Sequence, residues 1–273
     1  MMYAIVEGGD RMTVWQTVAL AALAGFTIYL GLPFARLGPR TQTIQNLLNA
    51  LAIGMLLFLV LDILAKTQEP LVEALGAARM FGQWREFGSL ACLLVVGLIL
   101  GVAGPVTYRR TAAGRRPSAG VSRAYQLALI IATGLGLHNF CEGLAIGQAA
   151  SSGAIGFTTI LIVGFGFHNI TEGFVVAAPV AVVGDVPPWS FLGIAGLIGG
   201  SPTLLGTLIG YRITSTPAFV FFLALAAGAL FYVIGEMLAV TQRFEQRFVS
   251  AWGLMIGFLL AYAFDLLHTI AGA

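Results

Sequence analysis

The sequence predicts an all-α membrane protein with eight transmembrane helices, in which helices 4 and 5 form an antiparallel pseudo-two-fold pair at the core. Three observations support this fold class. Of the 273 residues, 58% are hydrophobic and only 10% are charged, whereas soluble domains carry about 25% charged residues. The apolar residues form long continuous runs, and two neighbouring runs carry the same polar motif. A chain this apolar cannot cover itself with a wettable surface, so most of its length must face lipid or other helices.

Eight apolar runs are long enough to be spans, because a helix needs about 20 predominantly apolar residues to cross the hydrocarbon core. The runs are continuous rather than alternating, which favours helices over a barrel. Glu7 and Asp10 precede the first run, which is also too long for the apolar region of a signal peptide, so we count it as a span. The predicted spans are 12–35, 42–65, 87–108, 123–150, 154–182, 189–211, 217–240 and 248–271.

Two of the connections between spans are long. Residues 66–86 contain Glu69-Pro70 near their start and then space apolar residues on one face, which predicts a short amphipathic helix at the membrane interface. Residues 108–123 contain glycine, proline and five arginines and predict a flexible loop. Because lysine and arginine collect in cytoplasmic loops, we expect this loop in the cytoplasm and both termini outside it. The whole chain, 1–273, is then a single transmembrane domain.

Charged residues are distributed unevenly between the spans and their connections. Every lysine and arginine falls outside a predicted span or at its edge, whereas five acids and all three histidines fall inside. An ionised side chain at the bilayer centre costs at least about 2.5–3.5 kcal/mol. We expect no buried base to pair with these acids, so a bound cation is the missing partner. The residues within spans are Asp62, Glu142, Glu172, Glu236, Asp265, His138, His168 and His268.

The fourth and fifth spans carry two copies of one motif. GLGLHNFCEG occupies 134–143 and GFGFHNITEG occupies 164–173, so the glycines, His, Asn and Glu coincide after a shift of 30 residues. The connection between the spans is too short for anything but an antiparallel hairpin, and both motifs lie near the middle of their span. This arrangement predicts a local pseudo-two-fold axis, as in transporters with substrate sites at the midplane. We expect the glycines to let these two helices approach closely.

Helical spacing places the polar residues of each copy together. His138 and Glu142 are four residues apart, as are His168 and Glu172, so each pair lies on one helix face. The asparagine after each histidine lies to one side and borders the glutamate. Imidazole and carboxylate ligands together favour zinc, iron, manganese, cobalt or nickel over calcium and magnesium, which prefer oxygen ligands alone.

The two motifs resemble the signature helices of the ZIP family of divalent-metal transporters. The resemblance covers the eight-helix plan, the outward termini and a variable cytoplasmic loop between spans three and four. It implies a main site made by His138, Glu142, His168 and Glu172, with Asn139, Asn169 and the same glutamates at a neighbouring site. Met55 falls where family members can place a thioether against the metal.

The chain also departs from the family pattern. Many relatives have proline before the glutamate of span four, where this chain has Cys141. Several bacterial relatives have a glutamate before a proline in span six, and here that pair reads Ser201-Pro202. The lost carboxylate leaves open whether one ion or two bind. Cys141 is interpreted as a packing residue, although a soft ligand is the alternative.

These patterns predict a transporter that brings divalent transition metals into the cytoplasm by alternating access, and not an enzyme. Zinc is the first expected substrate, with Fe²⁺, Mn²⁺ and Co²⁺ as alternatives, and no catalytic cofactor is expected. The expected partners are metal ions and the lipid bilayer of a plasma membrane or bacterial inner membrane; a homodimer is left open, and nucleic acid is not expected. The rival hypotheses are an intramembrane metal-dependent enzyme and a metal-binding sensor without transport. Neither His-Glu-x-x-His nor a signalling domain occurs in the sequence to favour them.

Overall fold

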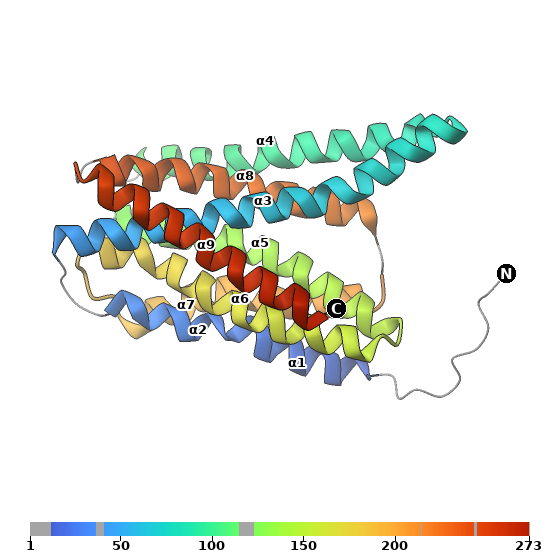
Figure 1. The fold of residues 1–273 in the computed structure, drawn as a ribbon, viewed down its shortest axis with the longest axis horizontal. Coiled ribbons are helices and arrows are strands. Elements are labelled where there is room, and N and C mark those ends of the chain that lie inside the picture. The colour runs from blue at the N-terminus through green and yellow to red at the C-terminus, as the bar shows by residue number, and fades with distance from the viewer. Residues whose placement is uncertain (1–11, 37–40, 115–122, 214, 243–244, 273) are drawn as a thin grey trace.

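The computed structural model describes residues 12–36, 41–114, 123–213, 215–242 and 245–272, and within these ranges it contains helices and no strand. The long helices lie roughly alongside one another, and α9 (Arg247–Gly272) crosses the bundle obliquely (Figure 1). Within the described ranges, seven helical segments are long and apolar enough to cross a membrane. The all-helical class is therefore confirmed, and the long apolar helices support a multi-pass membrane protein. The eighth predicted span, 248–271, corresponds to α9, which includes the apolar stretch Arg247–Ala263.

The first predicted span, 12–35, is a broken helix rather than a continuous one. It consists of α1 (Val14–Phe26), α2 (Ile28–Gly31) and the 3₁₀ helix η1 (Leu32–Arg36). At the break, the Thr27 hydroxyl lies 2.6 Å from the carbonyl oxygens of both Ala24 and Gly166. The hydroxyl of Thr27 thereby joins the broken span to the helix of residues Ile155–Val182, which contains Gly166.

Helix α3 (Gln42–Phe81) is a single helix of 40 residues. The expected separate interfacial helix within 66–86 is therefore wrong, because α3 continues through Pro70 and ends only at Gly82. Gly82 has a positive φ of 72°, which glycine adopts without steric cost, and its N–H donates to the Ala78 carbonyl. The chain then turns sharply into α4.

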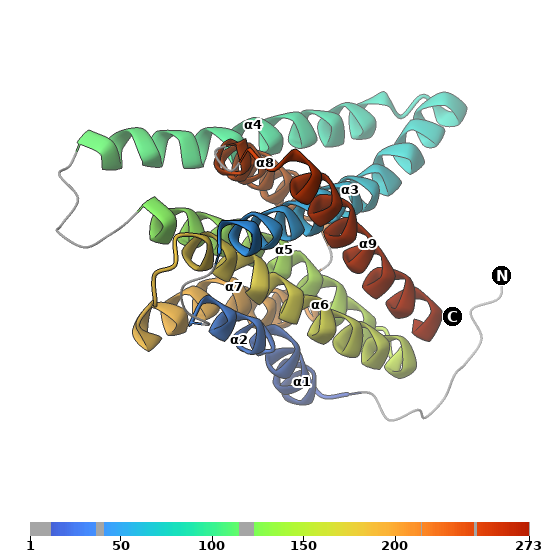
Figure 2. The ribbon, with the colours of Figure 1, turned by 60° about the vertical axis from the view of Figure 1, so that its left-hand side comes forward.

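Helix α4 (Trp84–Gly114) runs back along α3 and packs mainly against α8 (Thr216–Thr241), as Figure 2 also shows. Gly101 lies against the backbone of α8, and Gly228 of α8 lies against the backbone of α4. Helix α4 continues beyond the end of predicted span 87–108, so the first residues of the expected loop 108–123 are helical. Residues 115–122 lie outside the described ranges, so the prediction that this part is flexible stays a prediction.

Helices α5 (Arg123–Ser151) and α6 (Ile155–Val182) form an antiparallel hairpin through the middle of the bundle. The motif glycines were expected to bring these two helices together, and this is wrong. Gly143 of α5 faces the backbone of α7 (Trp189–Gly210) at Thr203, whereas Gly173 of α6 faces the backbone at Ile28. These glycines therefore let each helix pack closely on a different neighbour. The polar faces of α5 and α6 remain directed toward each other.

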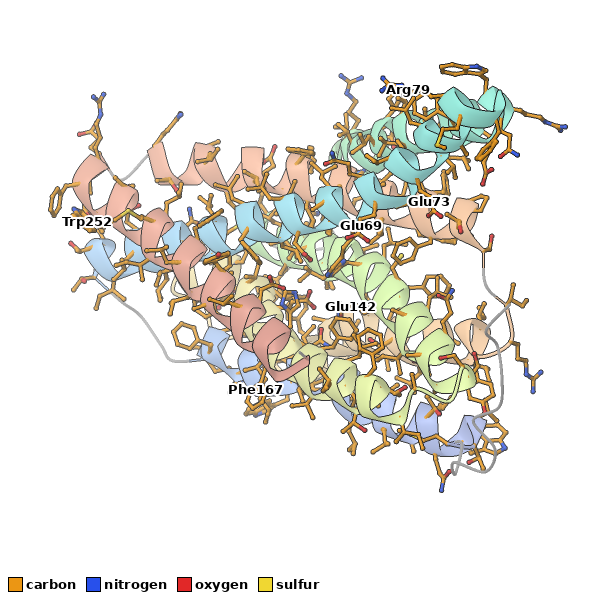
Figure 3. The ribbon with its side chains drawn as sticks, turned by 45° about the vertical axis from the view of Figure 1, so that its right-hand side comes forward. Glu69, Glu73, Arg79, Glu142, Phe167 and Trp252 are labelled. Carbon is orange, nitrogen blue, oxygen red and sulfur yellow. The ribbon has the colours of Figure 1, made fainter. Side chains whose placement is uncertain are left out.

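Helix α9 closes one side of the bundle by packing on α3. Gly54 of α3 faces the α9 backbone, and Gly257 of α9 faces the α3 backbone at Leu51. Outward-facing residues such as Phe167 and Trp252 are about half exposed, at 56% and 49% (Figure 3). Such large exposed apolar side chains are expected where a bundle faces lipid rather than water.

Candidate metal centre

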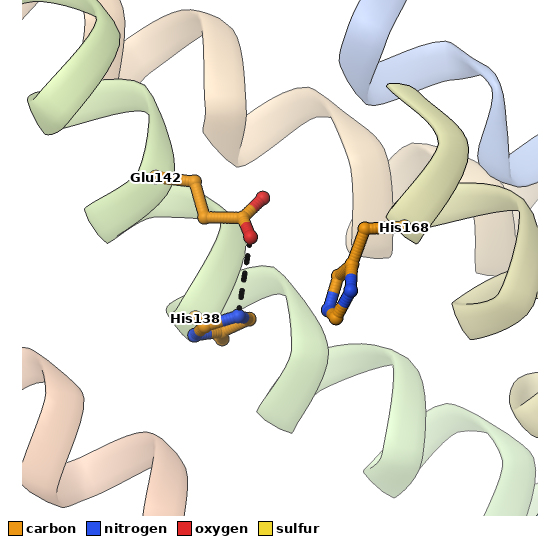
Figure 4. Close-up of side chains that lie close together, drawn as sticks. All are labelled: His138, Glu142 and His168. Carbon is orange, nitrogen blue, oxygen red and sulfur yellow. Dashed lines mark ion pairs between the residues drawn. The ribbon is translucent and has the colours of Figure 1, made fainter. Parts of the chain in front are cut away.

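The two motif copies meet inside the bundle. His138 and Glu142 extend from α5, and His168 extends from α6 toward them (Figure 4). One ligand atom from each of these three residues lies within 4.8 Å of the other two. Zinc holds nitrogen and oxygen ligands at about 2.0–2.2 Å, so two ligands of one ion lie at most about 4.4 Å apart. Small side-chain rotations are therefore enough to place all three atoms on a single ion.

Within each copy, the histidine and glutamate contact each other as their spacing predicts. Nε2 of His138 lies 3.3 Å from Oε1 of Glu142, and Nε2 of His168 lies 3.5 Å from Oε1 of Glu172. His138 is 1% exposed, and the two glutamates are 4% and 3% exposed. Residues this polar are almost never fully buried unless they are paired with a charge or a metal.

Several polar atoms of this group have no hydrogen-bond partner among the described residues. They include both ring nitrogens of His138, Nε2 of His168, Oε2 of Glu142 and Oε1 of Glu172. A buried polar atom left unpaired costs about 1–3 kcal/mol. A divalent cation accepts lone pairs from imidazole nitrogens and carboxylate oxygens alike, so a single ion would satisfy one ring nitrogen of each histidine together with glutamate oxygens that no protein donor reaches.

The two asparagines occupy matching positions but have different partners. Nδ2 of Asn139 donates to Oε2 of Glu172 at 2.7 Å and to the Gly199 carbonyl at 3.1 Å. Nδ2 of Asn169 donates to the Ala24 carbonyl at 3.0 Å. Both Oδ1 atoms are buried without a partner among the described residues. Each asparagine therefore joins helices through its nitrogen, while its oxygen stays available as a ligand.

The remaining residues singled out in the sequence lie in different surroundings. Met55 is partly buried and packs against the main apolar core, and Cys141 is 1% exposed within that core. Ser201 is partly exposed on α7. The side chain of His268 lies outside the described ones. The structure brings His138, Glu142 and His168 together, connects Glu172 to them through His168 and Asn139, and places Met55 against apolar neighbours.

A small cavity opens beside His168, and its wall includes Lys66, a residue that the sequence interpretation missed. Its volume is about 20 Å³, and its lining includes Lys66, Asp62 and Asp265 in addition to Glu142 and His168. Nζ of Lys66 lies 2.6 Å from Oδ2 of Asp62. The expectation that no base pairs with the acids within spans is therefore wrong for Asp62. Glu236 also has a basic partner, because its Oε2 lies 2.9 Å from a guanidinium nitrogen of Arg123, but the Arg123 side chain is 61% exposed and is not a buried base.

Both bases lie at the edges of predicted spans, where a basic residue alone does not indicate a partner inside the bundle. Lys66 follows span 42–65 by one residue, and its long side chain reaches back one helical turn to Asp62. The four-residue spacing of Asp62 and Lys66 was the available signal, because acid–base pairs at this spacing face each other on a helix.

Comparison with known proteins adds no assignment to this geometry. No family model matches the chain, and no curated protein matches it. The resemblance of the two motifs to ZIP transporters therefore stays a prediction, and the case for a metal site depends on the residues and contacts of this chain.

Proposed function

We propose that this protein transports divalent transition-metal ions across a membrane, with zinc as the first candidate and Fe²⁺, Mn²⁺ and Co²⁺ as alternatives. The observation that supports this most strongly is the His138–Glu142–His168 group. It combines two imidazoles and a carboxylate from two helices, with ligand atoms within 4.8 Å of one another, inside a bundle of apolar helices. Buried ionisable groups within spans are typical of ion pathways.

The proposed mechanism is alternating access around this site. Helices α5 and α6 carry the ligands, and their glycine faces pack closely on α7 and on the broken first span. Smooth contacts of this kind suit a rigid-body shift of the ligand-bearing helices past their neighbours. We infer a pseudo-two-fold relation between α5 and α6, supported by the repeated His–Glu contacts and by asparagines that both donate to a neighbouring helix's carbonyl.

The orientation of the protein is part of the same proposal. The arginine-rich segment 108–123 favours a cytoplasmic position, so that both termini lie outside and metal moves inward. A plasma membrane or a bacterial inner membrane is the proposed location, and a ZIP-like activity is the proposed class.

Metal flux into proteoliposomes tests the proposal. The purified protein is reconstituted with a zinc-sensitive fluorophore inside the vesicles, and Zn²⁺, Fe²⁺, Mn²⁺ or Co²⁺ is added outside. We expect flux in the native chain and its loss in Glu142→Gln. Glu73→Gln is the matched control, because Glu73 is exposed on α3, far from Glu142 (Figure 3), and its loss is expected to leave flux unchanged.

The outcomes separate the candidate functions. Flux that is absent in the native chain, or that persists in Glu142→Gln, overturns the transport proposal. Stoichiometric metal binding without flux would instead favour the metal-dependent enzyme or the sensor. No contact among the described residues specifically favours either of these two at present.

A further inference from the structure

The cavity beside the metal ligands has a cationic side chain at its wall. Asp62 and Lys66 come from α3, Glu142 from α5, His168 from α6 and Asp265 from α9. Four helices thus bring three acids, one histidine and one lysine to the same small space. Because Glu142 and His168 also belong to the ligand group, an ion that occupies this cavity beside them also lies beside Lys66.

The Lys66 ammonium is held in place by Asp62. The two charged atoms are 2.6 Å apart, and the Asp62 side chain is only 14% exposed while that of Lys66 is 37% exposed. The pair therefore lies partly inside the bundle, where screening by water and salt is weaker than at a free surface. Lys66 is the only lysine of the chain, and among the described residues that line this cavity it is the only lysine or arginine.

The size of the cavity limits what it can hold at one time. A volume of about 20 Å³ accommodates roughly one water-sized particle. A metal ion in this space would lie close to the Lys66 ammonium, and two cations at short range in a poorly screened site repel strongly. The same acids attract both cations, so the ammonium and the metal compete for one set of carboxylates.

We propose that Lys66 is a tethered cation that occupies the mouth of the metal site and must leave Asp62 when a metal ion enters. In this arrangement Lys66 neutralises the acids of the site in the absence of metal, and it lowers the affinity so that the ion can be released again. Asp62 then has two successive partners, first the ammonium and afterwards the incoming divalent ion. This inference depends on the proposed function for the identity of the competing cation.

Zinc affinity of charge variants in detergent tests the inference. Lys66→Met removes the charge but keeps an unbranched side chain, and we expect about tenfold tighter zinc binding. Lys66→Arg restores a positive charge and is expected to return the affinity toward the native value. Arg79→Met is the matched control, because it removes a positive charge from an exposed position on the same helix, away from the cavity, and should leave the affinity unchanged.

The sign of the Lys66→Met effect distinguishes competition from a merely structural ion pair. A structural pair would leave zinc affinity unchanged or weaken it when broken, and either result would overturn the inference. If the native chain binds no zinc at all, the proposed function fails first. If the native chain binds and transports zinc but Lys66→Met binds it no more tightly, only the inference about Lys66 fails.

Chemical labelling of native protein gives a second test that needs no variant at Lys66. Because the chain has one lysine, its acylation by an amine-reactive reagent can be located by peptide mass spectrometry without ambiguity. We expect zinc to increase the rate of acylation at Lys66 by releasing the amine from Asp62, and His138→Ala to abolish that increase. A labelling rate that zinc leaves unchanged in native protein would contradict the displacement.

Discussion

The two copies of the motif are nearly identical in sequence but differ in their surroundings. His138 on α5 is 1% exposed, whereas the side chain of His168 on α6 is 18% exposed and borders the cavity with Lys66. Glu142 also lines this cavity, whereas Glu172 is not among its described lining residues and accepts a hydrogen bond from Asn139. An internal repeat can therefore supply the same residue types twice, while the neighbouring helices give the two copies different burial and different hydrogen-bond partners. Glu142 and His168 line the cavity, whereas Glu172 is oriented by Asn139.

Removal of a histidine from either copy is expected to have the largest effect. His138→Ala and His168→Ala each remove one metal ligand of the three-residue group, and each should weaken zinc binding by about a hundredfold or more. This exceeds the 10–100-fold loss of affinity that is typical when a residue that orients a ligand is replaced. Isothermal titration calorimetry in detergent measures this. If only one of the two substitutions weakens binding, the metal is held by a single copy and the composite site is wrong.

The motif glycines test the packing partners of the two copies. A Cβ at Gly143 would meet the Thr203 carbonyl of α7, and one at Gly173 would meet the Ile28 carbonyl of α2. Gly143→Ala and Gly173→Ala are each expected to destabilise the fold by about 1–3 kcal/mol, measured as a lower Tm in detergent. Gly156→Ala is the control, because nothing lies within 4 Å of its added Cβ. Equal Tm values for all three variants would contradict the close packing described here.

The asparagines sharpen the comparison between the copies. Asn139 orients Glu172, so Asn139→Ala should weaken zinc binding by about tenfold, as expected for a residue that positions a ligand. Asn169 donates to the Ala24 carbonyl, and its nitrogen contacts no metal ligand in the described hydrogen bonds. Asn169→Ala should mainly cost about 1 kcal/mol of stability. A larger loss of affinity for Asn169→Ala than for Asn139→Ala would show that its amide oxygen binds the ion.

Met55 is expected to show the smallest effect. It packs against the apolar core, so Met55→Leu should change stability by less than about 1.5 kcal/mol, as for other volume-conserving exchanges. Zinc affinity should change by less than about threefold, which corresponds to well under 1 kcal/mol. A tenfold weakening measured by the same titration would instead identify the thioether as a ligand, as the ZIP resemblance implies.

Much of the fold and part of the site could be predicted from the sequence. Helices form where apolar runs lie in hydrocarbon, because backbone hydrogen bonds must be satisfied there. Helices α5 to α9 follow the predicted runs closely, whereas the first span is broken and α3 and α4 extend beyond theirs. The His–Glu pairs follow from the geometry of a single helix, so their contacts at 3.3 and 3.5 Å required no tertiary information.

The features that were missed depend on tertiary structure or on a choice between equivalent patterns. An amphipathic stretch after Pro70 has the same periodicity whether it begins a new helix or continues an old one, so the extent of α3 was not determined by pattern. Glycines at helical spacing show that a close neighbour exists but not which one, and hence α7 was overlooked as the partner of α5. Lys66 lies at the edge of a predicted span, and the sequence gives the place of a residue along a helix but not the direction in which its long side chain extends.

The length of α3 has a practical consequence for imaging. Forty residues at about 1.5 Å per residue make a rod of about 60 Å, twice the roughly 30 Å of hydrocarbon that a membrane offers. The end of this rod, joined to α4 at Gly82, bears exposed charges such as Glu73 and Arg79 and stands apart from the bundle (Figure 3). Small membrane proteins are difficult particles for electron microscopy because little of them emerges from the detergent micelle. This stiff two-helix projection gives an antibody fragment a well-ordered epitope and gives image alignment an asymmetric landmark.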